Sequence, residues 1–225
     1  MADAESQQVQ TLEPGRDSAA PGLSRRELRR RIWHVTPALL VLPLNFVPHA
    51  DPLSPTLLLI ILVAAAVSAG LIFVRFRRIQ RDAEDGRLAA VAGYAGSVLC
   101  TVLLCPDRLE VGLGVLAILA FGDGSATACG KLFGGPVLPW NNSKSVSGLG
   151  GFLVIGGCTT CLMYWAETWN PEAQEAPVSL GAAFLLTFPA VVLSSLAESW
   201  NSRINDNIRV GAVAAVSLLT LSILR

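Results

Sequence analysis

The sequence predicts an all-α, polytopic integral membrane protein with about seven transmembrane helices and a cytoplasmic N-terminus. Hydrophobic residues make up 52% of the 225 residues and charged residues only 15%, whereas soluble domains carry roughly 25% charged residues. The apolar residues form long runs, and the basic residues gather in every second connection between these runs. The formal net charge is zero, so no basic field favours nucleic acid as a partner.

Seven apolar runs predict the transmembrane helices, because a helix needs about 20 apolar residues to cross the hydrocarbon core. The predicted spans cover residues 32–47, 53–74, 88–105, 111–129, 148–166, 178–197 and 210–224. The second span has 22 residues and no charge. The seventh has only 15 residues, so it would cross with local thinning of the bilayer or lie partly re-entrant.

The distribution of arginine and lysine predicts the orientation of these spans. All but two of the 17 basic residues fall in the N-terminal segment or in the second, fourth and sixth connections. The exceptions are Arg108 and Arg225. Because basic loops stay in the cytoplasm, the N-terminus is predicted inside and the C-terminus outside.

The chain divides into a tail and one membrane domain. Residues 1–24 are polar and lack an apolar period, which predicts a disordered tail. Residues 25–225 form the membrane-embedded domain. No clear transit peptide is present, so we expect a bacterial plasma membrane, or the endoplasmic reticulum membrane if the chain is eukaryotic.

Asp123 is the first candidate site residue, because it is a carboxylate within an apolar run. A charged side chain at the centre of a membrane helix costs about 2.5–3.5 kcal/mol on insertion scales and marks a functional site by default. Small residues stand at positions 122, 124, 125, 126, 129 and 130, where they allow a ligand or another backbone to approach. Helix packing alone explains these small residues but not the acid among them.

A second candidate lies in the next connection, where Lys144 stands among hydroxyl side chains and is followed by glycines that open the fifth span. Backbone N–H groups at a helix start bind anions, and a neighbouring ammonium adds positive charge. The pattern indicates a phosphate site around Lys144, Ser145 and Gly148. An ordinary basic loop with glycine packing is the alternative.

The third candidate cluster ends the sixth span. If that helix continues, Glu198, Asn201, Ser202 and Asn205 share one face, with Asp206 close to it. Such a face offers oxygen ligands for a hard cation. A polar helix cap followed by an Asn-Asp-Asn turn is the alternative.

All three clusters fall on the same predicted side of the membrane. Together they contain carboxylates for Mg²⁺ and a lysine with glycine backbones for phosphates, which are the parts that phosphoryl transfer from a nucleotide requires. Asp123 and Asp206 would repel each other unless a cation lay between them. We therefore expect a magnesium-assisted transfer at the cytoplasmic face.

The order and spacing of these motifs resemble the CTP-dependent lipid kinases, the family of dolichol kinase, phytol kinase and the CTP-using diacylglycerol kinase. The similar segments are Gly122-Asp123-Gly124, Gly130-Lys131-Leu132-Phe133-Gly134, Lys144-Ser145-Val146-Ser147-Gly148, Glu198 and Asp206-Asn207. Arg30-Arg31-Ile32-Trp33-His34 resembles the basic segment with a histidine that often opens the family. The resemblance covers residues 29–210.

The resemblance implies an enzyme that transfers the γ-phosphoryl group of CTP to a lipid alcohol such as a polyprenol, phytol or diacylglycerol. It assigns Asp123 and Asp206 to Mg²⁺ and the triphosphate, and Glu198 to catalysis as the base or a second metal ligand. The implied nucleotide-binding residues are Gly122, Gly124, Lys131, Lys144, Ser145, Gly148 and Asn207. Asn205 stands where the family usually has an acid, which leaves the number of metal ions and the base open.

Two other functions fit the same residues. Phosphatidate cytidylyltransferases share a related glycine and lysine segment, although the long acidic motif that they usually carry near the C-terminus is not found after Asn207. A transporter or scaffold without enzymatic activity would make Asp123 a carboxylate of the transport path. His34 is a further candidate, although a histidine at the interface more often serves as an amphipathic residue.

Overall fold

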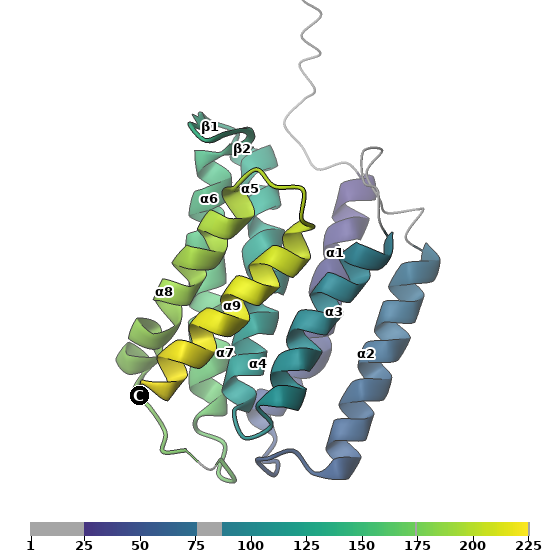
Figure 1. Cartoon of the computed structure of the whole chain (residues 1–225), viewed down its shortest axis with the longest axis vertical. Helices are drawn as coiled ribbons and strands as arrows, with labels where there is room; N and C mark the ends of the chain where they lie inside the picture. The colour runs from purple at the N-terminus through teal and green to yellow at the C-terminus, as the bar shows by residue number, and fades with distance from the viewer. Residues whose placement is uncertain (1–24, 76–86, 174, 225) are drawn as a thin grey trace, which may run out of the picture.

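The computed structural model describes residues 25–75, 87–173 and 175–224. The predicted disordered tail, and most of the basic connection between the second and third predicted spans, lie outside the described residues. The described chain is a bundle of roughly parallel helices with a short β-hairpin at one end (Figure 1). The predicted all-α class is therefore confirmed, with the hairpin as an addition.

The elements follow one another along the bundle in the order of the chain. They are α1 (Arg25–Val41), the 3₁₀ segment η1 (Leu42–Phe46), α2 (Pro55–Arg75), α3 (Arg87–Leu104), α4 (Leu109–Ala117), the π-helical segment η3 (Ile118–Asp123), α5 (Gly124–Phe133), β1 (Val137–Leu138), β2 (Asn141–Ser145), α6 (Val146–Gly151), the π-helical segment η4 (Phe152–Gly156), α7 (Gly157–Glu167), α8 (Leu180–Ser199) and α9 (Asp206–Ile223).

Five helices of the described part are long and apolar enough to cross a membrane. They are Pro55–Val74, Leu109–Phe133, Val146–Glu167, Leu180–Ser199 and Asp206–Ile223. The third predicted span is represented by α3, whose apolar part Val91–Leu104 is shorter. The first corresponds to α1, which contains Pro37 and continues into η1. A multi-pass membrane protein is thus compatible with the helices, and seven crossings stay a prediction.

The short seventh span was predicted wrongly. α9 begins at Asp206 and has 18 residues, which gives it a length of about 27 Å. It starts four residues earlier than hydropathy indicates because the side chain of Asn205 accepts a hydrogen bond from the Asn207 N–H and caps the helix. Local thinning or a partly re-entrant position stays a prediction, because this length is still slightly below the roughly 30 Å of the hydrocarbon core.

Connections that were predicted on one side of the membrane lie at one end of the bundle. The start of α1, the end of α2, the start of α3, the β1–β2 hairpin and the α8–α9 connection share this end (Figure 1). We call it the hairpin end. The C-terminus lies at the opposite end (Figure 1), where Arg108 Nη1 donates to the Ser222 carbonyl oxygen at 3.0 Å.

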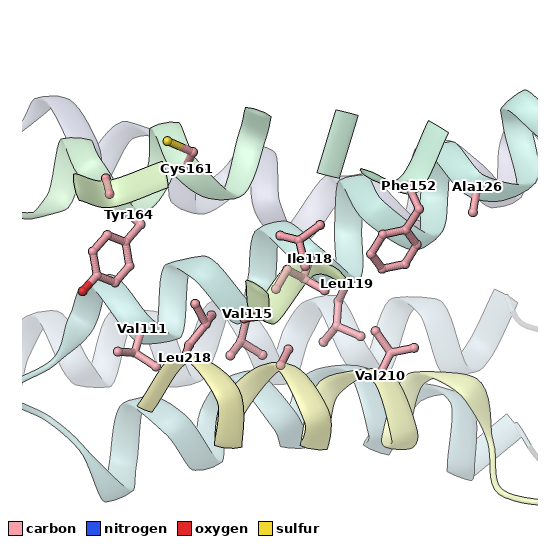
Figure 2. Packing of buried hydrophobic residues seen from close by; sticks show 14 residues of the cluster. Val111, Val115, Ile118, Leu119, Ala126, Phe152, Cys161, Tyr164, Val210 and Leu218 are labelled. Atoms are coloured by element: carbon pink, nitrogen blue, oxygen red, sulfur yellow. The ribbon is translucent and has the colours of Figure 1, made fainter. Parts of the chain in front are cut away.

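The continuous helix Leu109–Phe133 is the centre of the bundle. Of its most apolar 18-residue window, 78% is buried, compared with 0% for that of α2. Figure 2 shows its side chains Val115, Ile118 and Leu119 in one cluster with Phe152 of η4 and with the α9 side chains Val210 and Leu218. The mean hydropathy of the chain is +0.52. Its apolar side chains are found both in the packed centre and on an outer surface of exposed aliphatic residues.

The two π-helical segments contact each other at this centre. A Cβ atom placed on Gly156 would lie 2.9 Å from Gly122 Cα, and one placed on Gly122 would lie 2.9 Å from the Phe152 ring. Neither glycine therefore leaves room for a side chain. Because π-helical turns are frequent at functional sites, it is notable that η3 ends at Asp123.

At the end opposite the hairpin, a buried polar contact connects the α1–α2 connection with the end of α7. His49 Nε2 lies 3.1 Å from Glu167 Oε1, and the two side chains are 4% and 3% exposed. Asn170 Nδ2 donates to the His49 carbonyl oxygen at 2.7 Å, and the His49 N–H donates to Asn170 Oδ1 at 3.3 Å. These contacts join the α1–α2 connection to the end of α7.

Glu167→Ala is expected to lower the free energy of unfolding by about 1–3 kcal/mol, because it leaves Nε2 of the buried His49 imidazole without its partner. Thermal unfolding of the purified protein in detergent micelles measures the change. Glu172→Ala is the matched control, since Glu172 is exposed in the same loop, and it should change stability by less than about 0.5 kcal/mol. Equal stabilities of the two variants would contradict the role of the buried pair.

Candidate functional site

Three acids and one lysine from four distant segments meet at the hairpin end. The Lys144 ammonium on β2 pairs directly with Glu198 Oε1 in the last turn of α8, and its Nζ lies 3.8 Å from Asp206 Oδ2 at the start of α9. Asp123, at the end of η3, interacts electrostatically with both Lys144 and Glu198. We call Asp123, Lys144, Glu198 and Asp206 the acid–lysine cluster.

His34 of α1 contacts the Asp123 carboxylate. Its Nε2 lies 3.2 Å from Asp123 Oδ2 and 2.7 Å from the Leu119 carbonyl oxygen. Because both neighbours are acceptors, Nε2 carries the proton and donates to them. The ring of Tyr94 on α3 meets the imidazole edge-on at 5.0 Å and 75°, which fixes the plane of the imidazole.

Arg31 lies on α1, like His34, and also contacts Asp123. Its Nη1 donates to the Asp123 carbonyl oxygen at 3.5 Å, and its charge acts on the carboxylate. The side chain of Asp123 is only 16% exposed, and a charge withdrawn from water to this extent requires nearby partners. α1 supplies two of them.

The charge of Lys144 is maintained by the acids around it. Burial by itself lowers the pKa of the ammonium, but the carboxylate of Glu198, followed by those of Asp123 and Asp206, raises the pKa above its ordinary value. The Lys144 side chain is 28% exposed. Lys144 is therefore a permanent cation that an anionic ligand can reach.

The β1–β2 hairpin places Lys144 over the end of α8. Gly134 and Gly135 have φ values of 61° and 99°, a backbone conformation that favours glycine, and they turn the chain from α5 into β1. The Trp140 Nε1–H then donates to Ser199 Oγ at 3.1 Å, and Asn141 Nδ2 donates to the Ser199 carbonyl oxygen at 2.9 Å. These two contacts hold the hairpin against α8.

The predicted polar face over residues 198–205 is wrong. α8 ends at Ser199, and the next helix begins at Asp206, because the Asn205 cap starts a new helix instead of continuing the old one. Asn201 and Ser202 are exposed in the connection. The turn, and not a shared helix face, brings Glu198 and Asp206 to the same lysine.

Arg209 fixes the geometry of this turn. Its Nη2 donates to Asp206 Oδ1 at 2.7 Å and to the Glu198 carbonyl oxygen at 3.4 Å. One guanidinium therefore joins the last turn of α8 to the first turn of α9. The spacing of three residues between Asp206 and Arg209 is the signal by which the sequence could have revealed this pair.

Close packing of α5 against α6 accounts for several of the predicted glycines. A Cβ atom on Gly148 would lie 2.8 Å from the Ala126 carbonyl oxygen, and one on Gly130 would lie 2.9 Å from Ser145 Oγ. Ser125 Oγ donates to the Gly151 carbonyl oxygen at 3.0 Å across the same contact. The packing interpretation of these small residues is thus confirmed.

Two backbone N–H groups at the start of α6 already have hydrogen-bond acceptors within the protein. Ser145 Oγ accepts from the Gly148 N–H at 3.2 Å, and the Val146 N–H donates to the Pro136 carbonyl oxygen at 2.9 Å. The predicted phosphate site therefore depends on the Lys144 ammonium more than on these N–H groups. Contact of Ser145 or Gly148 with a nucleotide stays a prediction.

The remaining predicted site residues are Gly122, Gly124, Lys131 and Asn207. Gly122 and Gly124 are buried next to Phe152 and near His34, respectively. Lys131 is exposed in the last turn of α5. Asn207 lies in the first turn of α9 and lines a neighbouring groove.

The donor set suits a metal ion that arrives with a ligand. Among the described residues, no group of three or more His, Cys, Asp or Glu side chains is arranged to hold a metal ion by itself. Mg²⁺ is commonly bound by one or two carboxylates together with substrate phosphates and water. The Asp206 side chain is 50% exposed, so its carboxylate fits that kind of site, whereas a closed protein cage is not present among these residues.

An apolar groove of about 260 Å³ opens beside the cluster. It lies between α1, α2 and α3, and most of its lining side chains are aliphatic. Arg30, His34 and Asn207 line it as well. Because His34 also contacts Asp123, the groove and the acid–lysine cluster share one wall.

Comparison of the chain with protein-family models, with curated proteins and with solved structures gave no match. The arrangement of the hairpin end must therefore be interpreted from its own chemistry.

Sequence reasoning underestimated His34 and missed Tyr94 and Arg209. His34 was indicated only by the basic segment before it. Tyr94 stands in an apolar run without any motif, and its contact with His34 is a product of helix packing. For Tyr94, no signal in the sequence could have identified it.

Glu198→Gln is expected to lower the pKa of Lys144, because it removes the nearest of the charges that raise that pKa while burial of the ammonium remains. The pH dependence of amine modification at Lys144, followed by mass spectrometry, measures the shift toward lower pH. Asp206→Asn is the matched variant and should give a smaller shift, since its carboxylate is more distant and half exposed. An unchanged profile in Glu198→Gln would contradict the pairing.

Proposed function

We propose that the protein is a CTP-dependent kinase that phosphorylates a membrane lipid alcohol at the cytoplasmic face. The observation that supports this most is the position of the acid–lysine cluster next to the polar end of an apolar groove. A kinase of this kind must bring a highly charged triphosphate and an apolar chain to one point. Few arrangements at the edge of a bilayer offer both environments through one shared wall.

The charge balance of the site supports a magnesium–nucleotide as the ligand. The carboxylates of Asp123, Glu198 and Asp206 are accompanied by the permanent cations Arg31, Lys144 and Arg209. Since these charges roughly cancel, a triphosphate would bring an excess of negative charge. The half-exposed carboxylate of Asp206 would hold a Mg²⁺ ion that arrives with the nucleotide, and that ion would supply the missing positive charge at the phosphates.

Lys144 is suited to hold the phosphates. Its ammonium now pairs with Glu198, and an arriving phosphate competes for the same cation with a charge-assisted hydrogen bond. Glu198 is only 3% exposed and remains behind the lysine. We therefore assign Glu198 to positioning Lys144, in place of the base or metal-ligand role that the resemblance implies.

Asp123 is the best-placed group to accept the proton of the lipid hydroxyl. It contacts His34, which lines the groove, and it interacts electrostatically with Lys144, to which we assign the phosphates. In the transfer, the hydroxyl oxygen forms a bond to the γ-phosphorus while the bond from that phosphorus to the β,γ-bridging oxygen breaks. CDP leaves, and the hydroxyl proton passes to Asp123 Oδ. Ligation of Mg²⁺ by Asp123 as well as Asp206 stays a prediction.

The choice of CTP rests on the resemblance of the motifs, and the assay must test it directly. Purified protein is incubated with Mg²⁺, a lipid alcohol and CTP that carries the label on the γ-phosphate. Labelled lipid supports the kinase, whereas transfer of label only from α-labelled CTP would identify a cytidylyltransferase. Flux of a substrate without nucleotide consumption would favour a transporter.

Asp123→Asn is expected to lower kcat by about 100-fold or more, because general-base catalysis typically contributes factors of 10² to 10⁴. Its volume hardly changes, so the yield of folded protein in the membrane should stay the same. Asp107→Asn is the matched control, since Asp107 is exposed in the connection before α4, away from the cluster. Near-normal turnover by Asp123→Asn would remove Asp123 from the site.

A further inference from the structure

The apolar groove follows the length of the bundle away from the acid–lysine cluster. One wall runs from Arg30 of α1 to Leu44 of η1. The opposite wall is formed by α2, which runs in the other direction, so that Ile72 lies at the end of Arg30 and Leu57 at the end of Leu44. Figure 1 shows α1 and α2 running antiparallel beside α3. The side chains nearest the hairpin end are therefore Arg30 and Ile72, and those farthest from it are Leu44 and Leu57.

The two ends of the groove differ in polarity. Arg30 and His34 belong to α1 and Asn207 to the first turn of α9, two helices that begin at the hairpin end (Figure 1). Beyond them, the α2 wall has the small side chains Ala64, Ala65, Ser68 and Ala69 in its middle part, and the larger side chains Leu57, Ile60 and Ile61 toward the far end. A ligand with one polar head group and a narrow apolar tail matches a groove that is polar at one end and apolar along the rest of its length.

The length of the groove limits the tail. Leu57 and Ile72 are 15 positions apart on one helix, which corresponds to about 22 Å. One leaflet of the hydrocarbon core is about 15 Å thick, half of the roughly 30 Å of the whole core. If its polar end lies at the bilayer surface, a groove of this length is longer than one leaflet and can hold a tail that extends past it.

We propose that this groove binds the extended tail of a single-chain lipid alcohol, with the hydroxyl at His34 and Asp123, and that side chains of α2 set the longest tail accepted. The proposal rests on the proposed kinase function for the identity of the head group. The groove is lined mainly by residues of three helices and has polar side chains at one end, which fits one tail that extends from one head group. A two-chain glyceride would have to leave its second chain outside this groove.

Selection of the tail must act through shape. The surrounding lipid is as apolar as the groove, so moving a tail from the bilayer into the groove gains little from the hydrophobic effect. Contacts of the hydroxyl with His34 and Asp123 then determine the binding position of the head, and steric limits along α2 determine which tails fit. A bulky residue along the wall should therefore change tail preference at a depth that depends on its position.

Two substitutions on α2 test this at different depths. Ala65 lies seven positions from Ile72 and Ile61 lies eleven, or about 10 Å and 16 Å from the polar end. Ala66→Trp is the matched control, because Ala66 is exposed next to Ala65 but does not line the groove. Tail preference is measured as kcat/KM for geraniol, farnesol and geranylgeraniol, which share a head group and differ in length.

We expect Ala65→Trp to retain turnover of geraniol and to lose turnover of geranylgeraniol by about 10-fold or more, as steric exclusion from a shaped pocket does. Ile61→Trp should spare farnesol as well, and Ala66→Trp should keep the preference of the native chain. Equal loss for all three alcohols in Ala66→Trp and Ala65→Trp, or an unchanged preference in Ala65→Trp, would overturn the proposal.

Photolabelling separates the groove from the kinase reaction. A farnesol analogue with a diazirine at the end of its tail is irradiated with the native protein and with the Ala65→Trp and Ala66→Trp variants, and labelled peptides are identified by mass spectrometry. We expect label on the α1, α2 and α3 segments that line the groove, suppressed by farnesol and by Ala65→Trp but not by Ala66→Trp.

The outcomes of the two experiments are distinct. Groove labelling without any phosphoryl transfer would leave the tail site standing and overturn the kinase. Transfer with no labelling of these segments would overturn the tail site alone. If Ala65→Trp fails to fold, labelling of the native protein still decides: suppression by phospholipid or diacylglycerol as effective as that by farnesol would show that the groove merely holds bilayer lipid.

Discussion

The charge of Asp123 is the constraint on which the hairpin end depends. This carboxylate ends the π-helical turn of the most buried helix in the described bundle, where an isolated charge would be costly. Its partners come from α1, through His34 and Arg31, and from the hairpin, through Lys144. Lys144 in turn joins Glu198 and Asp206. One buried acid therefore accounts for the convergence of segments that are far apart in the sequence.

His34 connects the two environments that the proposed reaction requires. One side of the imidazole lies in the wall of the apolar groove, and its Nε2 contacts the Asp123 carboxylate. Tyr94 and the Leu119 carbonyl oxygen hold the ring in place. A lipid hydroxyl that reaches the end of the groove would therefore arrive beside the acid without entering the bulk water. This continuity distinguishes the arrangement from a cluster of charges that serves only to cap helices.

Hydropathy was enough to predict most of the helices. The central helix, the helix Val146–Glu167 and α8 were predicted within a few residues, because their apolar runs are long. The hairpin, the π-helical turns and the Tyr94–His34 contact were not predictable, since each depends on packing between distant segments. The convergence of Asp123, Lys144 and Asp206 was expected from their shared side, but the turn that achieves it at Asn205 contradicted the helix face assumed for Glu198.

The most direct test of the account is the coupling between Asp123 and Lys144 in the binding of CTP with Mg²⁺. The dissociation constant is measured by equilibrium binding to purified protein in detergent for the native chain, Asp123→Asn, Lys144→Ala and the double variant. If both residues face one magnesium–triphosphate, the losses are not additive, and the coupling free energy falls in the range of about 0.5–3 kcal/mol that interacting residues show. Strictly additive losses, or a native chain that binds no CTP, would contradict the shared site.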